Sequence, residues 1–217
     1  MTDPGDRPAP PDGWSDLPFF ATHWPALWTR LQAAPDWQPQ PDRLFRALHL
    51  TPPDTVRVVI LGQDPYPTPG RATGLAFAFP KAETPKDSLR NILKELDNDL
   101  GLHRAHGDLS GWAGQGVLLL NTLLSVPDGH PEGHRGWGWE VLTAQVLARV
   151  ATRPTAFVLW GARAQAAITP DPDVHLVLKA PHPSTLSAHR GFFGSRPFSA
   201  IDRWLVARGK RPVDWSA

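Results

Sequence analysis

Four short apolar runs recur along the chain, and turn or polar residues bound each of them. They cover residues 56–61, 116–120, 155–160 and 174–178. Short apolar runs with such boundaries are typical of parallel strands that are buried on both faces of a sheet. The pattern therefore predicts a mostly parallel sheet of four strands.

Helical spacing of apolar residues fills the intervals between these runs. Two sets of residues show it: Leu89, Ile92, Leu93, Leu96 and Leu100, and then Trp139, Leu142, Val146, Leu147 and Val150. Asp87 or Ser88 suits the N-cap of the first helix, and Gly101 suits its C-cap. A last helix is predicted over residues 199–208, and prolines interrupt an irregular helical stretch over residues 24–31 and 41–50. Strands that alternate with helices indicate an α/β fold, a single domain in which helices flank the central four-stranded sheet.

The length of 217 residues suits one domain, and no low-complexity linker divides the chain. Residues 1–13 are rich in Pro, Asp and Gly and are predicted to be disordered, which leaves residues 14–217 as the folded domain. No apolar run is long enough to span a bilayer, and the first residues lack a basic region followed by an apolar core. We therefore expect a soluble, cytoplasmic protein without membrane contact.

Charge is unevenly distributed along the chain, although its net charge is only +1. Residues 1–16 contain four Asp and one Arg, whereas residues 179–211 contain five Arg and two Lys against the single acid Asp202. The basic region indicates either a face that binds an anionic partner such as nucleic acid or a solvated surface rich in arginine. Charge alone leaves both interpretations open.

Polar or small residues follow each predicted strand. The first strand is followed by Gln63 and Asp64, the second by Asn121, the third by Gly161 and Ala162, and the fourth by the loop that contains His182. In open α/β sheets the ligand lies outside the carboxyl ends of the strands. We therefore expect a carboxylate, a carboxamide, an imidazole and two loops of small residues to converge on one cleft.

The loop after the first strand contains Asp64 and also Tyr66, the only tyrosine of the chain. Each of these two residues precedes a proline, which disfavours helical backbone there and restricts the loop before any ligand binds. Asp64 could orient or activate water in this loop, and Tyr66 could narrow the pocket.

Three further side chains suit a pyrimidine base. Asn121, if held rigidly, presents an acceptor beside a donor, which matches the carbonyl and ring N–H of uracil or thymine. Phe77 could stack on such a ring, and His182 could stabilise negative charge on a departing base through a ring N–H. Because a base that leaves as a resonance-stabilised anion needs no second carboxylate, these residues favour cleavage of an N-glycosidic bond over an O-glycosidic bond.

Residues 184–194 offer contacts that suit DNA. The hydroxyls of this segment, its backbone N–H groups and Arg190 are suited to phosphate, and Leu186 could occupy the space left by an extruded base. Base flipping requires parts of this kind.

Each of these residues also has an ordinary structural explanation when it is taken alone. Asp64 fits a turn and Phe77 fits the core, while Asn121 fits a strand cap, His182 a hydrogen-bonded loop and Leu186 general packing. Their joint placement at strand ends favours the functional interpretation.

The segment from His130 to His134 resembles a metal site or the H-x-E element of a base deaminase. The chain contains no cysteine, which excludes the Cys-x-x-Cys of such deaminases, disulfides and a thiolate nucleophile. The two histidines also lack the H-E-x-x-H spacing, and no nucleotide-binding glycine motif follows a strand. We predict a Pro/Gly loop without metal here, and the missing glycine motifs argue against a nucleotide cofactor.

These motifs occur in consistent order from about Trp14 to Trp215, and together they resemble family 1 uracil-DNA glycosylases. The matching blocks are Gly62-Gln-Asp-Pro-Tyr66, Gly74-Leu-Ala-Phe77, Ser88-Leu-Arg-Asn-Ile-Leu-Lys-Glu-Leu96, Gly116-Val-Leu-Leu-Leu-Asn121, Gly138-Trp-Glu140, Leu159-Trp-Gly-Ala162, Lys179-Ala-Pro-His-Pro-Ser184 and Arg190-Gly-Phe-Phe-Gly194. The resemblance implies that residues 14–217 are a catalytic domain that flips uracil out of single- or double-stranded DNA, cleaves its glycosidic bond and leaves an abasic site. It also implies a monomer that needs no cofactor and that DNA-mimicking proteins can inhibit.

The resemblance gives each pocket residue a role. Asp64 is expected to position the attacking water and stabilise the sugar cation, and His182 to hydrogen-bond uracil O2. Asn121 is expected to hydrogen-bond the O4 and N3-H edge of uracil, and Phe77 to stack on the face of its ring. Tyr66 is expected to block the methyl group of thymine, and the backbone of Gln63 to help line the pocket.

The resemblance also places a second set of residues on the DNA. Loops that grip the DNA backbone are expected to contain Ser88, Gly161, Ala162, Ser184 and Ser187. Leu186 matches the residue that enters the duplex as the base leaves, and Arg190 supplies positive charge beside it.

Five positions depart from the family pattern: Pro67 and Thr73 replace histidines, Lys86 interrupts a proline-rich loop, Ala162 replaces a serine and Thr185 replaces a proline. They concern water placement, loop stiffness and DNA affinity, so we expect uracil specificity with an altered DNA affinity or salt response. The two lost histidines keep a second hypothesis open, a protein that binds damaged DNA without efficient chemistry. A third hypothesis is a glycosylase with broader base choice, against which Tyr66 argues.

Overall fold

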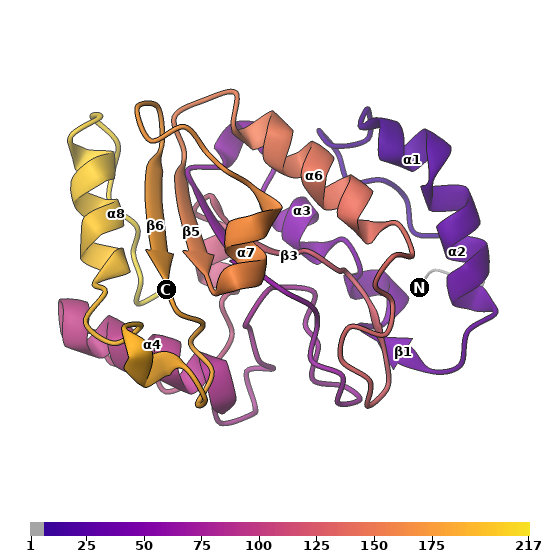
Figure 1. Ribbon diagram of the computed structural model, residues 1–217, viewed down its shortest axis with the longest axis horizontal. Coiled ribbons are helices and arrows are strands. Elements are labelled where there is room, and N and C mark those ends of the chain that lie inside the picture. Colours follow the sequence, from indigo (N-terminus) through magenta and orange to yellow (C-terminus); the bar gives the residue numbers. More distant parts are fainter. Residues whose placement is uncertain (1–6) are drawn as a thin grey trace.

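The computed structural model of the chain describes residues 7–217 and has a parallel four-stranded sheet at its centre (Figure 1). The strands are β2 (Val58–Gly62), β3 (Val117–Asn121), β5 (Ala156–Trp160) and β6 (Leu176–Ala180), in the order β3-β2-β5-β6. Every residue of β2 and β5 is buried, as is typical of parallel strands covered on both faces. The predicted α/β fold with a four-stranded sheet is confirmed, and each strand begins one or two residues later than its apolar run.

Helices cover the sheet and extend the molecule at both ends. They are α1 (Pro18–Thr22), α2 (Trp24–Gln32), α3 (Arg46–Leu50), α4 (Asp87–Leu100), α5 (Ser110–Ala113), α6 (Trp139–Val150), α7 (Ala162–Ala167) and α8 (Pro197–Val206), with short 3-10 turns η1 (Pro41–Arg43), η2 (Pro53–Thr55) and η3 (Ala188–Arg190). In Figure 1, α1 and α2 lie at one end and α4 and α8 at the other. A small antiparallel pair, β1 (Trp37–Gln38) with β4 (Val126–Pro127), completes the fold.

The ends of α4 show where the capping prediction was right and where it was wrong. Gly101 is the C-cap, with a left-handed φ of 67° and an N–H that donates to Asp97 O at 2.8 Å. The N-cap is Lys86 and neither Asp87 nor Ser88, because Lys86 is extended and its carbonyl already accepts the N–H of Arg90. Asp87 is the first residue of the helix, where its negative charge favours the helix N-terminus.

Structure begins before Trp14. The indole N–H of Trp24 donates to Pro8 O at 3.0 Å, and Pro11 is buried, so residues 8–13 contact the domain. Residues 1–6, part of the segment predicted to be disordered, lie outside the described residues.

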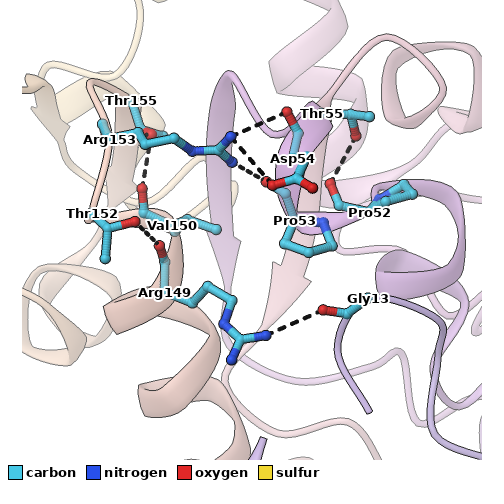
Figure 2. A network of polar contacts seen from close by, with 10 residues as sticks. All are labelled: Gly13, Pro52, Pro53, Asp54, Thr55, Arg149, Val150, Thr152, Arg153 and Thr155. Carbon is cyan, nitrogen blue, oxygen red and sulfur yellow. Dashed lines mark hydrogen bonds and ion pairs between the residues drawn. The ribbon is translucent and has the colours of Figure 1, made fainter. Parts of the chain in front are cut away.

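Two arginines at the end of α6 attach this N-terminal segment and η2 to the domain (Figure 2). Arg149 donates to Gly13 O at 3.2 Å and pairs with Asp16 at 2.6 Å. Arg153 donates to the carbonyls of Pro53 and Asp54. Because η2 precedes β2 and Arg153 precedes β5, the contacts of Arg153 lie near the amino ends of these two strands.

Aromatic residues pack against one another in several parts of the core. Trp24 packs against Phe45 at 4.9 Å and against Trp139 at 5.7 Å between ring centroids, which connects α2 with α6. Near the C-terminus, Trp215 packs against Trp112 and Phe198, each at 5.0 Å between ring centroids.

Within residues 7–217, no helix has both the length and the apolar character needed to cross a membrane.

Candidate active site

A cavity of about 220 Å³ opens at the carboxyl ends of β2, β3 and β6. Ser88 at the start of α4 lines this cavity. So do all six residues expected to hold or act on a base: Gln63, Asp64, Tyr66, Phe77, Asn121 and His182. Gln63, Asp64, Asn121 and His182 lie at strand ends and meet here, because parallel strands end at one edge of the sheet. Gly161 and Ala162 at the end of β5 were expected at the same cleft, but they are not among the residues that line this cavity.

Gly62 and Asn121 are direct partners in the register of β2 and β3. A β-carbon on residue 62 would lie 2.2 Å from Asn121 Oδ1, so only glycine leaves room for this amide. Beyond the strands, Gln63 O accepts the N–H of Leu123 at 2.9 Å and the hydroxyl of Thr122 at 2.7 Å. The resulting frame holds Asn121 beside the loop that contains Asp64.

Both carboxylate oxygens of Asp64 accept hydrogen bonds. Gln63 Nε2 donates to Oδ1 at 3.2 Å, and the backbone N–H of Glu132 donates to Oδ2 at 2.7 Å. Burial raises the pKa of Asp64 above its ordinary value, and these two hydrogen bonds oppose the rise by stabilising the charged form. A carboxylate has further lone pairs, so Asp64 can still accept a hydrogen bond from water. Gln63 thus acts on Asp64 through its side chain, whereas the resemblance implied only a backbone contact to the base.

Tyr66 and Phe77 form an aromatic wall of the cavity. The hydroxyl of Tyr66 donates to Phe77 O at 3.3 Å, and its ring packs against Phe79 at 4.6 Å. Phe77 has a φ of 64°, an uncommon conformation for a residue with a large side chain, and its ring packs near Trp160 and His182. Burial also raises the pKa of Tyr66, which keeps its hydroxyl neutral.

The environment of His182 determines both its charge and its tautomer. Burial lowers the pKa of His182, which favours the neutral ring. The backbone N–H of Ser184 donates to Nδ1 at 3.1 Å, so the single proton of the neutral ring lies on Nε2. Gly161 permits the close approach of this loop, since a β-carbon there would lie 2.9 Å from His182 Cβ. The result is a neutral N–H donor at the cavity.

The residues expected to hold DNA lie on adjoining loops. Ser187 Oγ donates to His182 O at 2.7 Å and lies 2.9 Å from Ser184 Oγ, which makes the loop a compact turn. Leu186 is 81% exposed on this turn, and Arg190 is exposed at the end of η3. Ala162 begins α7, where a backbone N–H has no partner within the helix.

The five departures from the family pattern occupy different environments. Pro67 lines the cavity, and its carbonyl accepts the N–H of Gly129 at 2.9 Å. Thr73 is buried at the cavity, and its carbonyl accepts a hydrogen bond from Arg46 at 3.1 Å. Lys86, Ala162 and Thr185 are exposed.

The histidines at 130 and 134 have hydrogen-bond partners of their own. His134 is buried with Nδ1 2.8 Å from Ser125 Oγ, and His130 is exposed with Nδ1 2.7 Å from Asp128 O. Across residues 7–217, no group of three or more His, Asp or Glu side chains is arranged to hold a metal ion.

Sequence reasoning missed two contributors to the site. Asn91 of α4 donates to Pro183 O at 2.8 Å and so supports the loop of His182. Glu132, which belongs to the segment interpreted as an ordinary Pro/Gly loop, donates to Asp64 from 68 residues away. A signal for Asn91 existed in the helical block Ser88 to Leu96, but nothing local marks Glu132.

Comparison with known proteins shows the family of this chain. The family model of the uracil DNA glycosylase superfamily matches residues 48–206. A uracil-DNA glycosylase of Ruegeria sp. (strain TM1040) is 54% identical, over 94% of this chain and 88% of that protein. One of Streptococcus pneumoniae (strain Hungary19A-6) is 49% identical, over 82% of each protein. The crystal structure of mimivirus uracil-DNA glycosylase superposes with a TM-score of 0.86 at 27% identity, covering 94% of this chain and 86% of the viral one. The chain therefore belongs to the uracil DNA glycosylase superfamily.

Proposed function

We propose that this protein is a DNA repair glycosylase that hydrolyses the bond between uracil and deoxyribose in DNA, releasing uracil and leaving an abasic site. The observation that supports it best is the pairing of one partly buried carboxylate with one neutral imidazole donor at a single cavity. A sugar cation and a base anion form when the glycosidic bond breaks, and these two groups match the two charges.

Asp64 and His182 divide the chemistry between them. The bond between C1′ of the sugar and N1 of uracil breaks with its electron pair remaining on the base. Asp64 stabilises the oxocarbenium-like sugar and orients the water whose oxygen bonds to C1′, and a proton of that water passes to the carboxylate and then to solvent. His182 donates its Nε2–H to uracil O2 as negative charge develops there, and the Ser184 N–H keeps the ring in that tautomer.

Three residues choose the base. Asn121 hydrogen-bonds the O4 and N3-H edge of uracil from a position that Gly62 leaves open. Phe77 stacks on the ring, and Tyr66 stands where the methyl group of thymine would lie. The hydrogen bond from the Tyr66 hydroxyl to Phe77 O and the packing of its ring against Phe79 hold this wall in position. Exclusion of the methyl group by this ring disfavours the hypothesis of broader base choice.

A second set of residues holds the DNA. Ser88, Ser184, Ser187, Gly161 and Ala162 contact the DNA backbone, and Arg190 adds a positive charge to attract it. The N–H of Gly161 already donates to Ala180 O at 2.9 Å, so Ala162 makes the phosphate contact at this place. Leu186 enters the duplex as uracil leaves, for which its 81% exposure fits it.

The proposal is tested with uracil-containing and thymine-containing oligonucleotides in EDTA, with alkali used to reveal abasic sites. We expect cleavage at uracil only. Asp64→Asn and His182→Ala should each lower turnover by about 10²-fold or more while DNA binding is retained. Ordinary turnover in both variants would remove the assigned roles, and binding without cleavage by the wild type would favour the damage-binding hypothesis.

Further properties accompany this function. The mimivirus uracil-DNA glycosylase structures include complexes with UGI, and we propose that DNA-mimicking inhibitor proteins of this kind also bind here. We further propose a cytoplasmic monomer that accepts single- or double-stranded DNA. Light scattering of the free protein and of its DNA complex would test the monomer.

A further inference from the structure

Glu132 is tied to the proposed catalytic carboxylate through its backbone. Its N–H donates to Asp64 Oδ2 at 2.7 Å, which is shorter than the 3.2 Å contact from Gln63 to the other oxygen. A hydrogen bond from a backbone N–H to a charged carboxylate is stronger than one between neutral groups. Glu132 therefore bears directly on how Asp64 is oriented.

The backbone of Glu132 is held in an uncommon conformation. Its φ is 60°, in the left-handed region that residues with a β-carbon rarely adopt. Such a conformation persists only where surrounding contacts enforce it, and it occurs often at functional sites. The Glu132 side chain has contacts that can hold its backbone in this conformation.

Two arginines grip the carboxylate of Glu132. Arg163 of α7 approaches both of its oxygens through its two terminal nitrogens, with Nη2 2.6 Å from Oε2, and Arg135 contacts Oε1. The Glu132 side chain is only 25% exposed, so this bidentate pair is partly shielded from solvent. Arg163 therefore joins α7 to the loop that supplies the N–H for Asp64.

A second hydrogen bond, between backbone groups, joins the loop of Glu132 to the loop of Asp64. Gly129 donates its N–H to Pro67 O at 2.9 Å, three residues from Asp64 in the chain. Pro67 itself has neither an N–H nor a polar side chain to offer Asp64. The segment 129–132 therefore supports the loop of Asp64 at two points. The contact from Gly129 to Pro67 joins backbone to backbone, whereas the contact from Glu132 reaches the side chain of Asp64.

We propose that Glu132 is a positioning residue, and that its ion pair with Arg163 holds its backbone N–H on Asp64. This inference rests on the proposed function. Glu132 is not among the residues that line the cavity. It acts through Asp64, and Arg163 acts through Glu132.

The test measures single-turnover uracil release with enzyme in excess, at saturating enzyme, for Glu132→Ala and Arg163→Gln. We expect the rate to fall about 5- to 10-fold in each, which is less than the complete loss of a hydrogen bond to a charged group would cost, because the Glu132 N–H is displaced and not removed. The acid limb of the pH–rate profile should move to higher pH in Arg163→Gln. That variant loses the hold on an N–H that stabilises ionised Asp64, while the negative charge of Glu132, which raises the pKa of Asp64, remains.

Arg149→Gln is the matched control, because Arg149 also pairs with a carboxylate, that of Asp16, but lies away from the cavity. It should keep the wild-type rate and acid limb. Thermal unfolding shows whether each variant is folded. If Glu132→Ala is not folded, Arg163→Gln carries the test, because the Arg163 side chain is about half exposed and its replacement disturbs little packing. Wild-type rates and profiles in folded Arg163→Gln, or an effect confined to DNA affinity, would overturn the inference. A wild-type protein that releases no uracil would instead overturn the proposed function.

Discussion

Gly62 of β2 lies opposite Asn121 of β3, and the amide of Asn121 occupies the space that a β-carbon on residue 62 would need. Gly62→Ala would bring that carbon to 2.2 Å from Asn121 Oδ1 and to 2.9 Å from Ala76 Cβ. We expect the amide to be displaced, with a fall in uracil release of about 10-fold or more and a loss of about 1–3 kcal/mol of stability from overpacking. Uracil release and urea denaturation measure the two effects.

Gly114→Ala is the control for Gly62→Ala, because its β-carbon would have its nearest contact at an ordinary 3.6 Å. It should leave uracil release unchanged. Equal activity in the two variants would show that Asn121 tolerates the intrusion.

The pH dependence of activity follows from opposite shifts at Asp64 and His182. The proposed step needs ionised Asp64 and neutral His182, and burial raises the pKa of the first and lowers that of the second. As pH falls, activity should be lost when Asp64 takes up a proton, at a higher pH than for an exposed aspartate. Protonation of His182 should not reduce the rate near its ordinary value of about 6.5.

Single-turnover rates between about pH 4 and about pH 8 measure this profile. An acid limb centred at about pH 6.5 in the wild-type profile would contradict the neutral state assigned to His182. Gly114→Ala, as the control, should show the same profile as the wild type.

Tyr66 offers a test of base selection that separates its ring from its hydroxyl. Under the proposed function, the ring of Tyr66 occupies the space that the thymine methyl group would need. Tyr66→Ala removes that ring, so we expect measurable release of thymine along with weaker release of uracil. Tyr66→Phe keeps the ring against Phe79 and loses only the hydrogen bond to Phe77 O, so it should still reject thymine. Paired assays on matched duplexes decide this, and thymine release by Tyr66→Phe would assign the exclusion to the hydroxyl.

His134 should make stability depend on pH. Trp139 Nε1 donates to Ser125 Oγ at 2.7 Å, which leaves the Ser125 hydrogen for His134 Nδ1 at 2.8 Å. Burial, with Arg30 nearby, lowers the pKa of His134 to about 4. The unfolded chain, with a pKa of about 6.5, binds the proton more readily, so this contribution is present above about pH 6.5 and is lost as pH falls toward 4.

We expect the loss to be about 1–3 kcal/mol in the free energy of unfolding. Urea denaturation of the wild type and of His134→Asn at neutral and acid pH measures it, since the advantage of the wild type should shrink in acid. A constant difference between the two proteins would place the titration elsewhere.

Lys86 tests the expected change in salt response. It is exposed at the N-cap of α4, next to Ser88 at the cavity rim, where it can meet a phosphate. Lys86→Ala should reduce the slope of log affinity against log salt by about 1. Lys210→Ala, beside the amino end of β2, should not. Unchanged slope and kinetics in both Lys86→Ala and Ala162→Ser would contradict an altered DNA grip at these positions.

Local patterns were enough to predict the sheet and most of the cavity. Four apolar runs define four strands, and because parallel strands end at one edge, residues at their carboxyl ends were expected to lie close together. This was right for Asp64, Asn121 and His182, whereas Gly161 and Ala162 after the third run do not line the cavity. The same local reasoning misplaced the N-cap of α4 by one or two residues, since an extended Lys86 cannot be distinguished from a capping Asp87 by composition.

Other features depend on contacts between distant segments. The left-handed backbone of Phe77 and Glu132 has no local signature, because neither residue type favours it. Pro8 lies against Trp24 although its neighbours have the composition of a disordered segment. The side-chain role of Gln63 likewise appears only once Asp64 is placed beside it.

The sequence by itself determined the strands, the edge at which chemistry gathers and the identity of the groups there, because periodicity and residue type are local properties. Only the tertiary structure decided the raised pKa of Asp64, the lowered pKa and the tautomer of His182, and the contacts that join Arg163 to Glu132 and Glu132 to Asp64. These depend on burial and on hydrogen bonds between residues far apart in the chain, 68 positions in the case of Glu132 and Asp64.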